Sequence, residues 1–120
     1  MTWRQDPRPK TQDPTMDRLS QLKRFAAEDP DDPFNRYALA LEFLKSDRAI
    51  AIELFDQLIR AHPEYLPTYY PFAHLLIEQK KTEKAEQIFL AGIEQAKAAG
   101  EEKTMKELKS AYQDWLYERE

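Results

Sequence analysis

The chain contains, at residues 69–93, the stretch YYPFAHLLIEQKKTEKAEQIFLAGI, in which large apolar residues recur every three or four positions. A similar stretch, FNRYALALEFLKSDRAIAIELFDQLI, precedes it at residues 34–59. The matching pairs are Phe34 with Tyr69, Tyr37 with Phe72, Ala38 with Ala73, Leu41 with Leu76, Ala51 with Ala85, Leu54 with Ile88, Phe55 with Phe89 and Ile59 with Ile93. The chain therefore contains an internal repeat about as long as one helical hairpin.

Each stretch predicts two amphipathic helices, because apolar residues spaced three and four apart lie on one side of an α-helix. A hairpin of this size cannot bury its apolar side alone, so neighbouring copies must stack to form a continuous core. Few β-branched runs and only two glycines, Gly92 and Gly100, favour helix over sheet. We therefore predict an all-α fold, an α-α superhelix of antiparallel helical hairpins with about six helices.

Capping residues and prolines mark where the predicted helices begin and end. Asp32 followed by Pro33 predicts one helix start, and Asp47 predicts the next. Thr82 is expected to cap a later helix, and Gly100 can adopt the left-handed conformation that ends it. The predicted helices span residues 16–28, 33–45, 48–61, 67–79, 83–98 and 101–119.

The 120 residues suit one domain, with 42% apolar residues for a core and 33% charged residues for its surface. We assign residues 16–120 to this helical domain, with one repeat at about 32–65, a second at about 66–99 and a closing helix at 101–119. Residues 1–15 are polar, contain three prolines and lack periodicity, so we expect a disordered tail. Trp3 in this tail is either a partner anchor or a mobile side chain.

The bulk charge and composition exclude several classes of partner. A formal net charge of −4 gives no general attraction to nucleic acid or to an anionic membrane, so neither is expected as a partner. No apolar run approaches the roughly 20 residues of a membrane span, and the N-terminus lacks the apolar core of a secretory signal. The absence of cysteine fits a reducing compartment. We therefore expect a cytoplasmic protein.

The two hairpins resemble the tetratricopeptide repeat, whose unit is about 34 residues folded as two antiparallel helices. The resemblance lies in large residues around an alanine in the first helix, and a small residue before an aromatic in the second. The residues that carry it are Phe34, Tyr37, Ala38, Leu41, Ala51, Phe55 and Pro63 in the first copy, and Tyr69, Phe72, Ala73, Leu76, Ala85, Phe89 and Gly92 in the second. The resemblance covers roughly residues 32–98 and implies a non-enzymatic protein-protein interaction module, an adaptor or scaffold.

In arrays of this family the first helix of each hairpin lines the concave face, where a peptide or helix of a protein partner binds. We expect the first such helix to turn one stripe into the core, namely Phe34, Tyr37, Ala38, Leu41 and Leu44. The neighbouring stripes then supply the candidate partner-binding residues, which are Asn35, Arg36, Leu39, Glu42, Phe43, Tyr70, His74, Ile77 and Glu78. The family's carboxylate clamp for acidic chaperone tails needs Lys, Asn and Arg at set places on this stripe. It is not expected here, because Asn35 alone suits such a place, whereas Leu39, Tyr70 and His74 occupy others.

Two alternatives would leave this face covered. The last helix has an apolar side that includes Tyr112 and Trp115, and it could fold over the face. A second copy of the chain could cover it instead, and the protein would then be a small structural homodimer. Ile50 and Ile52 make the first hairpin more apolar than the second, which fits either contact with the first helix of the chain or a dimer interface.

The sequence contains no cluster of residues typical of catalysis or metal binding. His62 and His74 lie on different predicted helices, with no carboxylate at metal-ligand spacing. The acidic run at residues 28–32 lacks the glycine-containing loop of a calcium site, and two glycines are too few for a phosphate loop. Three lysines at residues 80–84 form a small basic patch that suits at most a weak contact with an acidic partner. We therefore expect no enzyme activity, no cofactor and no metal site.

Overall fold

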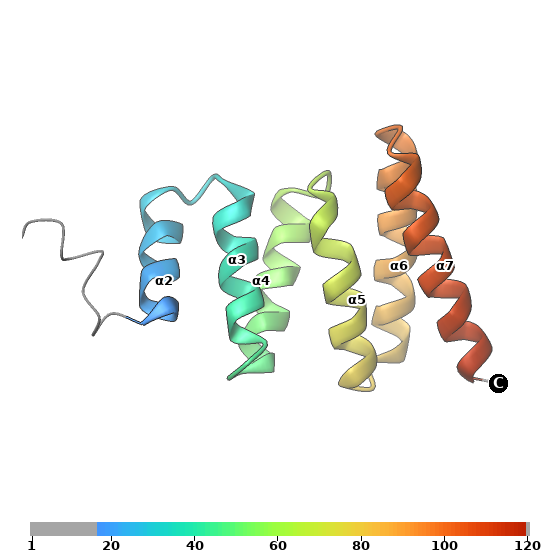
Figure 1. Cartoon of the computed structure of the whole chain (residues 1–120), viewed down its shortest axis with the longest axis horizontal. Helices are drawn as coiled ribbons and strands as arrows, with labels where there is room; N and C mark the ends of the chain where they lie inside the picture. Colours follow the sequence, from blue (N-terminus) through green and yellow to red (C-terminus); the bar gives the residue numbers. More distant parts are fainter. Residues whose placement is uncertain (1–16, 120) are drawn as a thin grey trace, which may run out of the picture.

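Six α-helices and one short 3₁₀ helix follow one another in a computed structural model of the chain, which describes residues 17–119 (Figure 1). The elements are α2 (Arg18–Glu28), α3 (Pro33–Phe43), α4 (Arg48–Ala61), η1 (Leu66–Thr68), α5 (Tyr69–Glu78), α6 (Thr82–Ala98) and α7 (Glu102–Arg119). No β-strand occurs within residues 17–119, so the predicted all-α fold is confirmed. The predicted disordered tail, residues 1–15 with Trp3, lies outside the described residues.

The helices pack in a row, and each one contacts its neighbours in the sequence. The pairs α3 with α4 and α5 with α6 form the two hairpins, while α2 packs against α3 and α7 packs against α6. The described chain is elongated, with dimensions of 66 × 30 × 21 Å. Figure 1 shows α4 and α6 behind α3, α5 and α7. The first helices of the hairpins therefore share one face with α7, which we call the α3–α5–α7 face.

Aspartate side chains begin the first three helices. Asp17 accepts a hydrogen bond from the backbone N–H of Ser20 at 2.8 Å, and Asp32 accepts one from Phe34 at 3.0 Å. Asp47 accepts one from Ile50 at 3.3 Å. Each bond satisfies an N–H group that has no acceptor within its own helix, which confirms the helix starts predicted at Asp32 and Asp47.

The α5–α6 hairpin begins and ends differently. Pro71 lies in the first turn of α5, where its missing N–H group would have no helical acceptor, so the helix continues through it. Thr82 is the first residue of α6 and makes no capping bond, so its predicted capping role is wrong. Lys81 occupies the cap position instead, and it follows Lys80, whose φ of 61° makes the tight turn. Gly100 ends α6 with a φ of 74°, as predicted.

The centre of the core is formed by the second hairpin and the helix before it. Tyr69, Phe72 and Leu76 of α5 and Phe89 of α6 are fully buried or nearly so. The ring of Phe72 stacks on Phe55 of α4 with 5.3 Å between ring centroids, which joins the two hairpins. The remaining core residues are Leu22, Leu39, Ala40, Phe43, Ala51, Leu58, Ala73, Leu75, Ala85, Ile88, Leu108 and Trp115. The resulting core is continuous from α2 to α7, as stacking of hairpins requires.

The side of α3 that faces the core is broader than the predicted one: Tyr37, Ala38, Leu41 and Leu44 of the predicted stripe pack against the core, but Phe34 does not. Phe34 was expected in the core, but it is 57% exposed, and Tyr37 and Leu41 are only half-buried. Leu39 and Phe43 are each only 8% exposed instead. The reason is α2, which packs against α3, brings the buried Leu22 into the same core, and places the Lys23 ammonium group 5.7 Å from the Phe43 ring centroid.

Candidate functional site

The exposed side of α5 presents three residues one turn apart. Tyr70 is 48% exposed, although the preceding Tyr69 is only 1% exposed. His74 follows on the same side, with 4.5 Å between its ring centroid and that of Tyr70, and the exposed Glu78 lies one turn further. All three were predicted as partner-binding residues, and they lie together on the α3–α5–α7 face.

A groove runs between α5 and α7, and two adjoining pockets form it. The smaller pocket has a volume of about 210 Å³ and is lined by Leu66, Pro67, Tyr70, Thr104, Glu107 and Leu108. The larger has a volume of about 490 Å³ and is lined by Tyr70, Glu107, Ser110, Ala111 and Asp114. Tyr70 and Glu107 line both pockets, so they lie at the junction. We call these two pockets together the α5–α7 groove.

Contacts with α6 hold α7 in place as one wall of this groove. The buried ring of Trp115 lies 5.7 Å from the Phe89 ring, and the Tyr112 ring lies 5.6 Å from it. The Tyr112 hydroxyl also donates a hydrogen bond of 2.7 Å to the Glu86 carboxylate. This bond, together with burial and the charge of Glu86, raises the pKa of Tyr112. Because the apolar side of α7 is used on α6, α7 does not fold over Tyr70 and His74.

The predicted residues on α3 have mostly structural contacts. Leu39 and Phe43 are buried, so their side chains are not available to a partner on the surface. The Asn35 amide donates hydrogen bonds of 3.4 Å to the backbone carbonyls of Phe25 and Asp29, which hold the end of α2 against α3. Glu42 is half-buried and pairs with Lys45 at 3.2 Å. These contacts leave α5 with more of the exposed predicted side chains than α3.

Arg36 and Ile77 are half-buried, and Ile77 packs against the core. Glu78 forms an ion pair of 3.5 Å with Arg48 of α4, in which both side chains remain more than half exposed. Of the predicted set, Tyr70 alone lines the α5–α7 groove. His74 and Glu78 line a separate, smaller pocket of about 180 Å³, with Leu44, Arg48, Pro71 and Leu75.

The sequence did not predict the α7 wall of the groove, because the last helix was expected either to close the array or to fold over the binding face. Its groove residues Thr104, Glu107, Ser110, Ala111 and Asp114 are spaced three and four apart. This polar and small-residue stripe adjoins the apolar side and could have been found by the same periodicity. Nothing in the local pattern indicated that α5 would lie opposite it.

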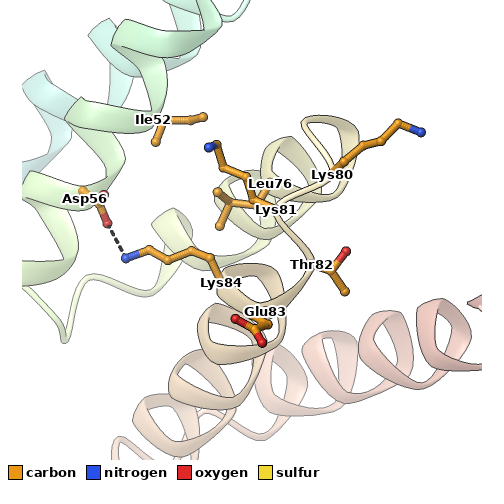
Figure 2. Close-up of a pocket in the computed structure, with 8 residues that line it drawn as sticks. All are labelled: Ile52, Asp56, Leu76, Lys80, Lys81, Thr82, Glu83 and Lys84. Atoms are coloured by element: carbon orange, nitrogen blue, oxygen red, sulfur yellow. Dashed lines mark ion pairs between the residues drawn. The ribbon is translucent and has the colours of Figure 1, made fainter.

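A further pocket, of about 650 Å³, lies at the turn between α5 and α6 (Figure 2). Lys80, Lys81 and Lys84 line it together with Glu83 and Asp56, and Lys84 pairs with Asp56 at 3.1 Å. Figure 2 shows the three ammonium groups pointing in different directions. The positive charges therefore do not converge on one anion, and two carboxylates partly balance them. We assign no ligand to this pocket.

Within residues 17–119, no group of three or more His, Asp or Glu residues is arranged to hold a metal ion. His62 lies 3.5 Å from Glu64 in the turn after α4. Among the described helices, none combines the length and the apolar character needed to cross a membrane.

Comparison with known proteins identifies the family. The family model described as tetratricopeptide repeat matches residues 43–111, more than half of the chain. No curated protein matches significantly. The solution NMR structure of a tetratricopeptide repeat domain protein from Salinibacter ruber is 40% identical, covers 72% of this chain and 88% of that chain, and has a TM-score of 0.67. A crystal structure of a tetratricopeptide repeat domain protein from the same organism is 40% identical over 68% of this chain and 92% of that chain, with a TM-score of 0.63. The chain belongs to the tetratricopeptide repeat family, whose domains are protein-interaction modules.

Proposed function

We propose that this chain binds a peptide segment of another protein in the α5–α7 groove. The observation that carries the proposal is the position of Tyr70, a 48% exposed aromatic side chain at the junction of two adjoining pockets. Tyrosine is enriched where interfaces gain most of their binding energy, because it offers a large apolar ring and a hydroxyl group at low entropic cost. The proposal includes the role of a cytoplasmic adaptor or scaffold predicted from the sequence.

The two walls of the groove offer different contacts to such a segment. Tyr70, Leu66 and Pro67 provide an apolar surface on the α5 side. Thr104 and Ser110 provide hydroxyl groups on the α7 side. Pockets arranged in sequence between two helices suit an extended segment, because its side chains enter them one after another. This arrangement supports an extended ligand over a helix, which would need one wide apolar groove.

The proposal is tested by selecting peptides from a random library on the full-length chain. The selected peptide is then titrated into isotopically labelled protein. We expect amide resonances of α5 and α7 to shift, while those of α4 stay unchanged. The variant Tyr70→Ala should bind the peptide at least about tenfold more weakly. The matched control is Tyr117→Ala, because Tyr117 is 79% exposed and lines neither pocket of the groove.

Equal losses in the two variants, or shifts confined to another face, would show that the groove is not the binding site. The fold of both variants is checked by far-UV circular dichroism, and we expect no change because both side chains are exposed.

Self-association is a second candidate function, and one observation favours it. Phe25 of α2 and Phe34 of α3 are 41% and 57% exposed, and Asn35, next to Phe34, donates a hydrogen bond to the Phe25 carbonyl. Exposed aromatic residues near each other at one end of the row suit contact with a second copy. Sedimentation equilibrium tests this candidate. A dimer that dissociates in Phe34→Ser supports it, and a monomer at all concentrations excludes it.

A further inference from the structure

Among residues 17–119, the side chains that line the α5–α7 groove carry negative charge and no positive charge. Glu107 lines both pockets and Asp114 lines the larger one, whereas no lysine or arginine lines either pocket. Within residues 17–119, neither carboxylate forms an ion pair. Lys103, one turn before Glu107, is exposed and lines neither pocket. Within the described part of the chain, the groove therefore presents two carboxylates that form no ion pair with a lysine or arginine.

The spacing of these carboxylates sets the spacing of the charges that would complement them. Glu107 and Asp114 are seven residues apart on α7, so they lie two turns apart on nearly the same side of the helix. This separation corresponds to about 10 Å along the helix axis. Residues three positions apart in a segment extended as a polyproline II helix lie on the same side, because that helix has three residues per turn, and they are separated by about 9 Å. An extended ligand with cationic residues at positions i and i+3 therefore matches both carboxylates.

The smaller pocket specifies a third feature of the ligand. Besides Glu107 and Thr104, it is lined by the apolar side chains Leu66, Pro67 and Leu108 and by the ring of Tyr70. Its volume of about 210 Å³ accommodates an apolar side chain, and such a side chain would displace water from apolar walls. Because Glu107 also borders this pocket, the apolar residue must lie beside the cation that meets Glu107.

We infer that the partner of the α5–α7 groove is a basic, extended peptide segment with two Lys or Arg residues three positions apart and an apolar residue beside one of them. This inference rests on the proposed function and adds the chemistry of the partner. An acidic peptide would instead place like charges against Glu107 and Asp114, which opposes binding. Nucleic acid would be disfavoured in the groove for the same reason, because its phosphates are negative.

The inference is tested with three fluorescein-labelled peptides of equal length that share the same apolar residue. They carry arginine, glutamine or glutamate at the two spaced positions. Fluorescence anisotropy with the full-length chain at low ionic strength gives the dissociation constants. We expect the glutamine peptide to bind about tenfold more weakly than the arginine peptide, and the glutamate peptide more weakly still. Added salt should weaken the arginine peptide most, because screening acts on the charged contacts.

A pair of matched double variants locates the effect. Glu107→Gln with Asp114→Asn removes both groove charges at nearly constant shape. Glu94→Gln with Glu118→Gln removes the same net charge at exposed positions that line neither groove pocket. We expect the groove variant to lose about tenfold in affinity for the arginine peptide and the control to lose less than about twofold. Equal losses would overturn the inference, because the effect would then come from total charge.

The outcomes separate this inference from the proposed function on which it rests. If the three peptides bind equally well and all shift the α5 and α7 resonances, the charge preference is wrong and the groove remains the binding site. If neither these peptides nor a library-selected peptide shifts those resonances, both the groove and the charge preference are wrong. Arginine-dependent binding that is lost in the groove variant supports both.

Discussion

The Tyr112 hydroxyl of α7 donates a 2.7 Å hydrogen bond to the Glu86 carboxylate of α6. Glu86 occupies the position in the second hairpin that Ile52 occupies in the first. The second hairpin therefore has a polar residue at this position, where the neighbouring α7 supplies the Tyr112 hydroxyl as its partner. This bond and the packing of Trp115 on Phe89 decide where α7 lies. They thereby decide that α7 forms a wall of the α5–α7 groove and does not cover it.

We predict that Tyr112→Phe lowers the free energy of unfolding by about 0.5–1.5 kcal/mol near neutral pH, because the hydrogen bond to Glu86 is lost. The loss should shrink at high pH. The raised pKa of Tyr112 means that the folded state favours the protonated hydroxyl. This stabilisation is complete below the unfolded pKa of about 10 and disappears as the pH rises through the folded value.

Urea unfolding of the wild type and Tyr112→Phe at a series of pH values measures this difference. Tyr117→Phe is the control, because the 79% exposed Tyr117 should show no such dependence. A difference between wild type and Tyr112→Phe that stays constant up to pH values well above about 10 would contradict the prediction.

We predict that Tyr69→Phe lowers the free energy of unfolding by about 1 kcal/mol. The Tyr69 hydroxyl donates a 2.5 Å hydrogen bond to the backbone carbonyl of Pro63, which ties α5 to the turn after α4. The phenylalanine ring would keep the packing and leave that carbonyl without its partner. The adjacent Tyr70→Phe is the matched control, since Tyr70 is 48% exposed and should lose less than about 0.5 kcal/mol. Equal effects in urea unfolding would argue against a role for the hydrogen bond.

We predict that Gly92→Ala destabilises the chain, although alanine is normally the better helix former. A Cβ atom at Gly92 would lie 2.8 Å from both Cβ and Cγ of Tyr69 and 3.0 Å from a methyl carbon of Leu108. The resulting overpacking costs about 1–3 kcal/mol, which should exceed the helix-propensity gain of about 1 kcal/mol. Thermal unfolding measures the net effect, and a raised melting temperature would show that α5, α6 and α7 are packed less closely than described.

We predict opposite outcomes for two phenylalanines on α3. Phe43→Ala should lower the free energy of unfolding by about 3 kcal/mol, because Phe43 is only 8% exposed and lies in the core. Phe34→Ala should lower it by less than about 1 kcal/mol, because Phe34 is 57% exposed. Urea unfolding of the two variants decides which side of α3 is buried. A larger loss for Phe34→Ala than for Phe43→Ala would contradict the burial of Phe43 and the exposure of Phe34.

The helices of this chain follow from local rules that the sequence displays directly. The starts at Asp32 and Asp47 and the stop at Gly100 depend only on nearby backbone groups and their dihedral angles. Thr82 failed as a predicted cap because α6 begins at that residue, so its hydroxyl does not lie before the free N–H groups. A difference of one residue at a helix start changes a capping assignment without changing the fold.

Local rules do not predict which apolar side of α3 is buried. Phe34 and Phe43 both belong to apolar stripes at helical spacing, and nothing in the spacing says which stripe α2 will cover. The candidate site likewise combines residues that the sequence predicts with residues that it does not. Periodicity places Tyr70 and His74 on the exposed side of α5, whereas Glu107 and Asp114 line the groove only because α7 lies opposite Tyr70.

The sequence by itself determined the all-α class, the hairpin repeat and the exposed side of α5, because each depends on residues within one or two turns of helix or on a repeat visible along the chain. Only the tertiary structure decided the buried side of α3 and the α7 wall of the groove. Both depend on which of several similar apolar stripes meet across separate helices. That choice follows from packing between residues far apart in the sequence, such as Phe89 with Trp115 and Glu86 with Tyr112.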